Sequence, residues 1–373
     1  MTLEIKRIAS RIIARANEAP ADAVLRAELK VARLSPGDNS AISNLVFTYF
    51  RWRGWLDLES NIERQFDRAW DLELRFNADP ESFSTQELLK AVPGWVSEEI
   101  PVSREWLVSL QTRPTLWLRA KRGTGSQLTA KLGHCVPGPN LAPDALEYRG
   151  DAVLFRRPEF HAGEFEMQDL ASQFVGILCG PKPGETWWDA CAGEGGKLLH
   201  LSELMENKGL IWASDRSERR LTLLRRRTAR AKVFNYRVAA WDGTSKLPTK
   251  TKFDGVLIDA PCSGVGTWQR NPHARWTTTP EDVRELSAIQ QQLVLNAAAA
   301  VKPGGRLIYA VCTLARKETD AVAALCSQQL PLFEPSPWPA WPNELQGASD
   351  RKWIWPQDYR SNGMFLAAWK RLL

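Results

Sequence analysis

The sequence contains no uninterrupted apolar run of the roughly 18 residues that a membrane-spanning helix requires. Charged residues interrupt the apolar positions of the N-terminal segment MTLEIKRIASRII, which has neither the apolar core nor the cleavage site of a secretory signal. With 44% hydrophobic and 25% charged residues, the composition is typical of a soluble globular protein. We therefore expect a cytoplasmic protein with no membrane partner.

Cysteine and histidine are also scarce, at six and four residues in a chain of 373. The cysteines show no CxxC pair and no regular spacing, which argues against a disulfide framework and against a zinc site. The histidines form no HxxxH or HExxH cluster, so we expect no metal. The thiols are expected to be reduced, and they belong to Cys135, Cys179, Cys191, Cys262, Cys312 and Cys326.

The charge and the aromatic content of the sequence are compatible with an anionic binding partner. The net charge of +6 and the pI near 9.0 permit such a partner without requiring one. Seventeen tryptophans are many for this length, and aromatic faces beside arginine, as in RWRGW at residues 51–55, could stack on unpaired bases. Core packing is the stronger interpretation of most of them, because large aromatic side chains are usually mostly buried.

Two parts of the chain precede a more regular third. Apolar residues at three- and four-residue spacing predict helices over 6–19, 21–34 and 41–66, so residues 1–80 should form a helical domain. From residue 80 onward, proline and glycine separate short pieces such as TLWLRA (115–120), SQLTAKLG (126–133) and DAVLFRR (151–157). These pieces predict a small mixed domain with strands over residues 81–162.

From residue 163 to the end of the chain, strand and helix patterns alternate. Alternation of this kind predicts an α/β fold with a doubly wound, Rossmann-like parallel sheet that is covered by helices on both faces. The predicted helices are 166–179, 197–207, 219–231 and 280–301, and the predicted strands are 186–192, 209–215, 234–240, 253–260 and 305–312.

Glycines and acidic residues gather at the ends of these strands. The run DACAGEGGK (189–197) leads from the first strand into a helix, and its glycines let the backbone turn and approach a ligand closely. It matches neither GxGxxG nor the P-loop pattern. Asp215, Asp242 and Asp259 end three further strands, where a carboxylate can accept a hydrogen bond from a ribose hydroxyl or an adenine amino group. For any one of them alone, a helix N-cap or an Asx-turn would be the preferred interpretation.

Together these runs resemble the Sun-type, RsmB-like RNA cytosine-5 methyltransferases of the NOL/NOP/Sun group. The resemblance covers roughly 163–373 and combines DACAGEGGK, DAPCSGVGT, QRNPHARW, KPGGRLIYAVCTL and NGMFLAAW with Asp215 and Asp242. Upstream, LVFTYFRWRGWLDLE is similar to the NusB-like helical domain of bacterial members, and PTLWLRA to the start of the small connecting domain. The resemblance implies an RNA-binding NusB-like domain over 1–80, a connecting domain over 81–162 and an S-adenosylmethionine-dependent methyltransferase domain over 163–373.

The activity that the resemblance implies is transfer of a methyl group to carbon 5 of a cytosine, in RNA that we expect to be ribosomal. Carbon 5 is a poor nucleophile until a thiolate adds to carbon 6, so the chemistry requires a cysteine. By resemblance, Cys312 is the nucleophile and Cys262 assists product release, while Asp259 holds the cytosine edge. A lone cysteine at a strand end is more often a small buried hydrophobe, but DAPCSG and YAVCTL favour the catalytic interpretation.

The cofactor implied is S-adenosylmethionine. The family usually has Ala-Pro where this chain has Gly193 and Glu194, and Thr where it has Val311. Asn362 and Met364 replace an acidic and an aromatic residue that are common there. The residues expected to bind the cofactor are the loop Cys191, Ala192, Gly193, Glu194, Gly195, Gly196 and Lys197 and the carboxylates of Asp215, Asp242 and Asp259.

Other interpretations stay open. The same chemistry could act on transfer RNA, or the chain could be a non-catalytic RNA-binding factor of ribosome assembly; two retained cysteines and Asp259 favour the enzyme. The arginines of 219–232 are expected to form a solvated helix face, with a phosphate track as the alternative. QRNPHARW (269–276) is a stronger candidate for RNA contact, through Arg270, Arg275 and Trp276. We expect a monomer.

Overall fold

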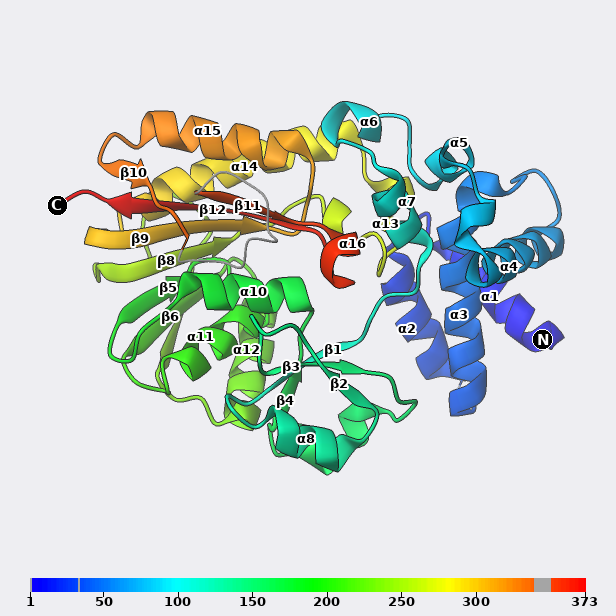
Figure 1. The fold of residues 1–373 in the computed structure, drawn as a ribbon, viewed down its shortest axis with the longest axis horizontal. Coiled ribbons are helices and arrows are strands. Elements are labelled where there is room, and N and C mark those ends of the chain that lie inside the picture. The colour runs from blue at the N-terminus through cyan, green and yellow to red at the C-terminus, as the bar shows by residue number, and fades with distance from the viewer. Residues whose placement is uncertain (1, 33, 339–349) are drawn as a thin grey trace. The chain divides into compact units, whose positions relative to one another are not determined.

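The computed structural model describes residues 2–32, 34–338 and 350–373, and the chain folds into two compact units (Figure 1). The first comprises Met1–Pro114 and Thr267–Pro280, and the second comprises Thr115–Gly266 and Glu281–Leu373. The three domains with boundaries at residues 80 and 162 remain a prediction.

The first unit is helical. Its longer helices are α1 (Leu3–Arg15), α2 (Ala21–Ala32), α3 (Pro36–Trp52) and α4 (Ile62–Ala78). The short helices α5 (Thr85–Leu88), α6 (Val96–Glu99), α7 (Arg104–Gln111) and α13 (Ala274–Thr277) follow. Helices α1 to α4 share one apolar core around Ile8, Ile12, Leu45, Phe50 and Phe66. This arrangement confirms the helical character predicted for the N-terminal part.

The single helix predicted over 41–66 is wrong in its middle. The helix α3 ends at Trp52, and α4 begins only after Asn61, whose side chain accepts a hydrogen bond of 2.7 Å from the Glu63 amide. Gly54 lies between them, where a Cβ would stand 1.8 Å from the Lys90 carbonyl oxygen. The apolar periodicity runs through both helices, so it could not reveal the break.

Two side chains of residues 51–55, Arg51 and Trp52, are buried within this unit. Arg51 is buried and forms an ion pair of 3.0 Å with Glu73, which also accepts a hydrogen bond of 2.8 Å from the Trp52 indole. Burial lowers the pKa of Arg51, and the Glu73 carboxylate opposes that effect. Arg51 and Trp52 therefore serve the core and offer no face to an unpaired base.

The run QRNPHARW is also largely structural. Arg275 is fully buried, and its guanidinium donates hydrogen bonds to the carbonyl oxygens of Leu110 and Trp268. The Trp276 indole donates to the Phe50 carbonyl at 2.7 Å. The predicted RNA contact through Arg275 and Trp276 is therefore wrong, because both polar groups are used inside the first unit. Arg270 is exposed.

The second unit begins with a small antiparallel sheet in the order β2-β3-β1-β4. Its strands are β1 (Trp117–Ala120), β2 (Cys135–Pro137), β3 (Ala145–Tyr148) and β4 (Phe165–Met167). Of the three pieces that suggested strands, only 115–120 forms one. Residues 126–133 lie mostly in helix α8 (Gly125–Leu132), and 151–157 contain the 3-10 turn η4 (Leu154–Arg156), followed by α9 (Pro158–His161).

The large sheet of the second unit has the order β10-β12-β9-β8-β5-β6-β7, and β11 pairs with β12. Strands β9, β8, β5, β6 and β7 are parallel, whereas β12 runs antiparallel to β9. The bounds are β5 (Thr186–Asp189), β6 (Leu210–Asp215), β7 (Tyr236–Ala240), β8 (Phe253–Asp259), β9 (Val301–Val311), β10 (Phe333–Pro335), β11 (Arg351–Ile354) and β12 (Met364–Arg371).

Helices cover both faces of this sheet (Figure 1). Helices α10 (Leu170–Cys179), α11 (Gly196–Leu204) and α12 (Glu218–Ala231) pack on one face around Phe174, Leu198 and Leu224. Helices α14 (Pro280–Ala298) and α15 (Asp320–Gln329) pack on the other around Val294 and Val322. A short α16 (Pro356–Tyr359) precedes β12. The doubly wound α/β fold predicted from the alternating pattern is confirmed.

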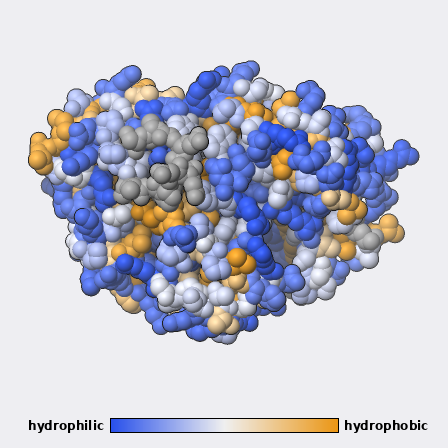
Figure 2. All heavy atoms as spheres, in the orientation of Figure 1, coloured by the Kyte–Doolittle hydropathy of each residue, from blue (hydrophilic) through white to orange (hydrophobic). Residues whose placement is uncertain are grey.

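The surface follows from the same patterning. Among the described residues, no helix has the length and apolar character needed to cross a membrane. Hydrophilic side chains cover most of the face seen in Figure 2, with scattered hydrophobic patches between them.

Candidate active site

A cavity of about 410 Å³ lies at the carboxyl ends of the parallel strands in the second unit. The loop after β5 and the ends of β6, β8 and β9 contribute to it, as the open edge of a doubly wound sheet allows. Every residue predicted for catalysis or cofactor binding lines this cavity except Gly195. The strand order therefore brings together residues that lie far apart in the sequence.

The glycine-rich loop turns sharply beside the cavity. Gly193 and Gly195 have φ values of +55° and +85°, a conformation that glycine adopts without steric cost. A Cβ on Gly193 or Gly196 would meet nothing within 4 Å, whereas one on Gly195 would lie 2.8 Å from the Leu224 side chain. Gly195 thus shapes the turn against α12, and Gly193 and Gly196 leave the backbone open to a ligand.

Asp215 is almost fully buried at the end of β6. One carboxylate oxygen accepts a hydrogen bond of 3.0 Å from the Gly193 amide, and the other accepts one of 2.8 Å from the Ser217 amide. The Arg220 guanidinium lies 3.8 Å away. Each carboxylate oxygen can accept a second hydrogen bond, so Asp215 fixes the loop and still has acceptor capacity on the cavity side.

Asp242 forms the local turn that its residue type favours. Its Oδ1 accepts hydrogen bonds from the Thr244 amide at 3.1 Å and from the Thr244 hydroxyl at 2.8 Å, and these bonds lower the pKa of the carboxyl group. The residue also lines the cavity, beside Trp241 and Gly243. Asp242 therefore forms an Asx-turn and also lies in the cavity wall.

Lys197 and Asp259 form an ion pair inside the cavity, at 2.5 Å between Nζ and Oδ2. Burial acts to lower the pKa of Lys197, but the charges of Asp259 and Cys312 outweigh it and the pKa is raised. The ammonium group therefore stays charged. The sequence placed Lys197 with the cofactor loop; in the structure its side chain reaches across to the end of β8.

The two cysteines that follow β8 and β9 meet at the same place. The sulfur of Cys262 lies 3.3 Å from the sulfur of Cys312. The hydrogen bond to Cys312, burial and the nearby negative charges of Cys312 and Glu318 raise the pKa of Cys262 well above its ordinary value. Cys262 is therefore held as a neutral thiol beside Cys312.

A third cysteine of the cavity is chemically distinct. Burial, followed by the negative charges of Asp189 and Asp259, raises the pKa of Cys191 well above its usual range. A thiol that stays protonated is a poor nucleophile. Cys191 contributes wall and backbone to the cavity, in line with its predicted place in the cofactor loop.

Sequence reasoning missed several groups at this site. Asp189 is fully buried at the end of β5, and neither carboxylate oxygen has a hydrogen bond of normal geometry to a described residue. Burial and then the charge of Asp259 raise the pKa of Asp189 to about 8. It is the first residue of DACAGEGGK, so that motif could have drawn attention to it. Asp189 itself does not line the cavity. The wall residues that sequence reasoning missed are Ser172, Arg216, Arg220, Arg227, Trp241, Gly243, Ala260, Pro261, Ile289 and Leu293.

The arginine-rich helix α12 is mostly a solvated face. Arg219, Arg225 and Arg226 are exposed, and Arg225 pairs with Glu218 at 2.7 Å. Arg227 points back toward the loop, where it donates to the Glu194 carbonyl at 3.2 Å and pairs with Glu166 at 2.9 Å. The helix therefore supports the glycine-rich loop in addition to presenting charge outward.

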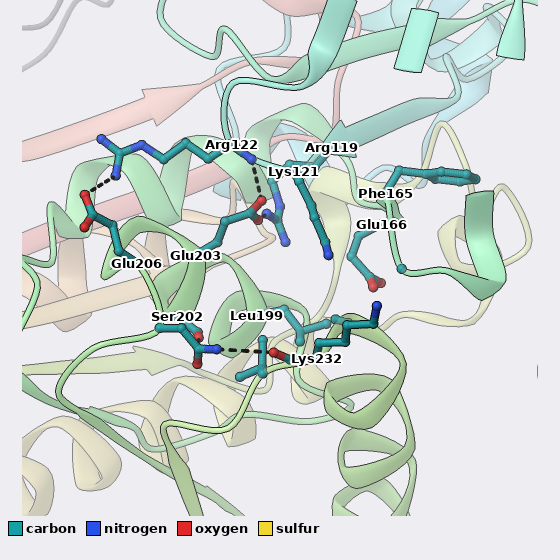
Figure 3. A pocket seen from close by; sticks show the side chains of 14 residues that line it. Arg119, Lys121, Arg122, Phe165, Glu166, Leu199, Ser202, Glu203, Glu206 and Lys232 are labelled. Atoms are coloured by element: carbon teal, nitrogen blue, oxygen red, sulfur yellow. Dashed lines mark hydrogen bonds and ion pairs between the residues drawn. The ribbon is translucent and has the colours of Figure 1, made fainter. Parts of the chain in front are cut away.

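A second cavity, of about 290 Å³, lies beside β1, β4 and the carboxyl ends of α11 and α12 (Figure 3). Its acidic side chains are already paired: Glu203 accepts a hydrogen bond from the Arg122 amide at 2.6 Å and pairs with Arg119, and Glu166 pairs with Arg227 and Arg230. It contains neither cysteine nor any predicted site residue. The candidate active site is therefore the cavity that holds the thiol pair.

A known protein family matches a large part of the second unit. A family model described as 16S rRNA methyltransferase RsmB/F matches residues 176–370. The probable ribosomal RNA small subunit methyltransferase B of Bacillus subtilis is 34% identical over 227 residues, which are 60% of this chain and 51% of that protein. The protein of the same name from Synechocystis is 32% identical over 68% of this chain and 58% of that protein. The chain thus spans little more than half the length of these relatives.

The putative methyltransferase Rv1407 of Mycobacterium tuberculosis matches a larger share of the chain, with 30% identity over 82% of this chain and 69% of that protein. Solved structures share the fold. The crystal structure of PH0851 superimposes with a TM-score of 0.82 at 23% identity and covers 100% of both chains. NSun6 from Pyrococcus horikoshii, solved with SFG, superimposes with a TM-score of 0.65 at 18% identity over 72% of this chain and 94% of that one.

Proposed function

This chain belongs to the 16S rRNA methyltransferase RsmB/F family, and on that premise we propose that it methylates carbon 5 of a cytosine in RNA, with S-adenosylmethionine as methyl donor. The observation that carries the proposal is the pair of thiols 3.3 Å apart in the cavity that also holds the glycine-rich loop and Asp215. Relatives named for the small ribosomal subunit favour ribosomal RNA as the substrate. A substrate of that kind places the protein in the cytoplasm.

The cavity fits the cofactor. Its volume of about 410 Å³ lies in the range of small-molecule sites, and Gly193 and Gly196 leave the loop backbone accessible. We assign the backbone of residues 191–197 and the Asp215 carboxylate to the amino-acid and ribose parts, and Asp242 to the adenine amino group. When bound, S-adenosylmethionine supplies a methyl group made electrophilic by its positively charged sulfur. SFG, present in the NSun6 structure, is an analogue of this cofactor.

We assign the first chemical step to Cys312. Its thiolate attacks carbon 6 of the cytosine, the new S–C6 bond forms, and the electron pair of the C5–C6 double bond moves toward carbon 5 and the ring carbonyl. The Lys197 ammonium, fixed 2.5 Å from Asp259, supplies a positive charge where negative charge develops. Asp259 accepts a hydrogen bond from the cytosine amino group, which orients the ring.

Cys262 serves the last step. After methylation, the proton on carbon 5 must leave; its C–H electron pair restores the C5–C6 double bond, and the S–C6 bond breaks with its electrons returning to the Cys312 sulfur. The Cys262 sulfur lies 3.3 Å from the Cys312 sulfur, and its neutral thiol donates a hydrogen bond that stabilises the Cys312 thiolate as the S–C6 bond breaks, while water takes the proton from carbon 5. The raised pKa of Cys262 keeps its thiol protonated for this role.

A non-catalytic RNA-binding role is the competing interpretation, and the thiol pair argues against it. Two sulfurs in contact, beside a buried ion pair, have no use in a surface that only binds RNA. Transfer RNA remains the alternative substrate for the same chemistry. The helical N-terminal domain, 1–80 in our prediction, is proposed to grip RNA, and the protein is proposed to act as a monomer.

Bisulfite sequencing of RNA from cells with and without the gene tests the function. We expect one or more cytosines of the small-subunit ribosomal RNA to lose protection when the gene is absent. If cytosines lose protection from bisulfite only in transfer RNA, then transfer RNA is the substrate. An unchanged pattern in all RNA, with the wild-type protein expressed, would overturn the proposal.

A further inference from the structure

A buried carboxylate connects the loops that carry the two thiols. Glu318 ends the 3-10 turn η6 (Arg316–Glu318) and has no exposed surface. Its Oε1 accepts a hydrogen bond of 2.9 Å from the Ser263 amide, and its Oε2 accepts one from the Ser263 hydroxyl and one of 3.1 Å from the Thr313 hydroxyl. One residue beside each thiol thus donates to the same carboxylate.

Each of these donors is the direct neighbour of a reactive cysteine. Ser263 follows Cys262, Thr313 follows Cys312, and the two hydroxyl oxygens lie 2.9 Å apart. The Gln290 amide of α14 completes the tie, because its nitrogen donates to Glu318 at 2.8 Å and to the Pro261 carbonyl at 2.9 Å. The chain is therefore held on both sides of Cys262.

The pairing of β8 with β9 stops short of the two cysteines, although β12 supports β9 as far as Val311. Pairing between β8 and β9 ends at Asp259 and Ala310, before either cysteine is reached. Beyond that point the Gly266 amide donates to the Cys312 carbonyl at 3.1 Å. Side-chain hydrogen bonds must set the spacing of the sulfurs where the backbone ladder does not.

We propose that Glu318 is a positioning residue for the reaction, whose carboxylate ties the loop after β8 to the loop after β9 and so keeps the Cys262 and Cys312 sulfurs in contact. Glu318 does not line the cavity and so has no place for contact with cofactor or base. The catalytic importance of the distance between the two sulfurs rests on the proposed function. The effect of Glu318 on that distance does not.

Electrostatics agrees with this role. The charge of Glu318 is one of the causes, after the hydrogen bond to Cys312 and burial, that raise the pKa of Cys262. The Tyr309 hydroxyl lies 2.6 Å from the Glu318 carbonyl oxygen and 2.9 Å from the Gln290 side-chain oxygen, which anchors the turn to β9. The carboxylate thus sits on a fixed support behind the cavity, and its charge acts on Cys262.

A thiol-bridging reagent tests the proposal without RNA. Phenylarsine oxide forms two As–S bonds with two adjacent thiols and releases water, so it reports whether the sulfurs stay close. The rate of adduct formation should fall by about tenfold in Glu318→Ala, because misplaced groups lose the advantage of proximity. Glu318→Gln should stay within about threefold of wild type, because its oxygen can accept from Ser263 and Gln290 while its amide donates to hydroxyls that rotate.

Controls make the result specific. Cys312→Ala defines the background from the other cysteines, and Glu285→Ala, an exposed glutamate on α14, should not change the rate. Cofactor affinity measured by calorimetry should match wild type in every Glu318 variant, because Glu318 lies outside the cavity. If Glu318→Ala does not fold, Thr313→Val removes the hydroxyl that ties the β9 loop to Glu318 and also contacts Ser263 and the Ala315 amide, and it should slow bridging by about threefold.

The activity readout separates this proposal from the function. In Glu318→Ala we expect kcat for methyl transfer to fall by about 100-fold with KM for RNA unchanged, and Glu318→Gln to restore most of it. A Glu318→Ala protein that bridges as fast as wild type would overturn the positioning role even if RNA is methylated normally. If wild type methylates no RNA but bridging depends on Glu318 as described, the function fails and the positioning stands.

Discussion

The sulfur of Cys262 lies 3.3 Å from the sulfur of Cys312, although fifty residues separate the two in sequence. Neighbouring parallel strands β8 and β9 bring them to one edge of the sheet, and the network at Glu318 holds their loops together. Two thiols at this spacing have complementary tasks in the proposed reaction, because one forms the covalent bond and the other assists its release.

Substitution of the two cysteines should therefore block different steps of the reaction. With Cys312→Ala no S–C6 bond can form, so neither methylated RNA nor a covalent complex should appear. With Cys262→Ala the bond forms but is expelled slowly, so protein should accumulate on RNA as a species that survives a denaturing gel. Trapping by Cys312→Ala but not by Cys262→Ala would reverse the roles, and normal methylation by both would rule out the two-thiol mechanism.

The Lys197–Asp259 pair should set the alkaline limit of activity. Asp259 raises the pKa of Lys197 against the lowering effect of burial, so Asp259→Asn should lower that pKa and let the ammonium lose its charge at lower pH. We expect the alkaline limb of the kcat profile to move to lower pH, and Lys197→Met to lose about 100-fold in kcat at all pH values. A profile for Asp259→Asn that coincides with wild type in its alkaline limb would contradict this assignment.

Asp215 should be required for cofactor binding. Asp215→Ala removes the acceptor of the Gly193 and Ser217 amides together with the proposed ribose contact, so affinity for S-adenosylmethionine should fall by about tenfold or more. Asp242→Ala, whose carboxylate already bonds Thr244, should cost less. Calorimetry on both variants is the measurement, and equal affinity of Asp215→Ala and wild type would show that the ribose assignment is wrong.

Asp189 should make stability fall with rising pH. Its folded-state pKa of about 8 lies above the ordinary value of a carboxyl, so its contribution is complete below about pH 4 and is lost as pH rises through 8. Relative to Asp189→Asn, the free energy of unfolding of wild type should decline by about 1.4 kcal/mol per pH unit within that window. Denaturant unfolding at several pH values measures the difference, and parallel curves would contradict the burial of an uncompensated carboxyl.

The helical unit can be tested for RNA contact without removing it. Deletion of 1–80 would take away Phe50, whose carbonyl binds the Trp276 indole, so the remainder of the unit would lose part of its core. Arg64 and Arg68 are exposed on α4. Changing both to Ala should weaken RNA binding and make its salt dependence shallower, with cofactor affinity unchanged. An unaltered salt slope would exclude this face as a phosphate contact.

The doubly wound sheet could be predicted because strand and helix periods alternate clearly from residue 163 onward. The bounds of individual strands could not be predicted. Strand β9 begins at Val301, four residues before its predicted start, and a register shift against β8 near Phe253 accommodates the additional residues. The antiparallel β12 is buried over Met364–Trp369, and a continuous apolar run does not distinguish a strand from a buried helix.

The residues that line the cavity of the candidate site include those named from the sequence, except Gly195, but their contacts could not be predicted. Motif resemblance identified both cysteines and the carboxylates, since each follows a strand end. The reach of Lys197 to Asp259 and of Glu318 to Ser263 spans 62 and 55 residues, and no local pattern encodes such pairs. Glu318 stands in the polar run ARKET, which reads as an exposed turn although the side chain is fully buried.

Nucleoside analysis of methylated RNA tests the central claim most directly. Small-subunit ribosomal RNA from cells that lack the gene is incubated with purified protein and methyl-labelled S-adenosylmethionine, then digested to nucleosides and separated. We expect label in 5-methylcytidine with wild type and none with Cys312→Ala. Label in any other nucleoside, or equal label with Cys312→Ala, would contradict that claim.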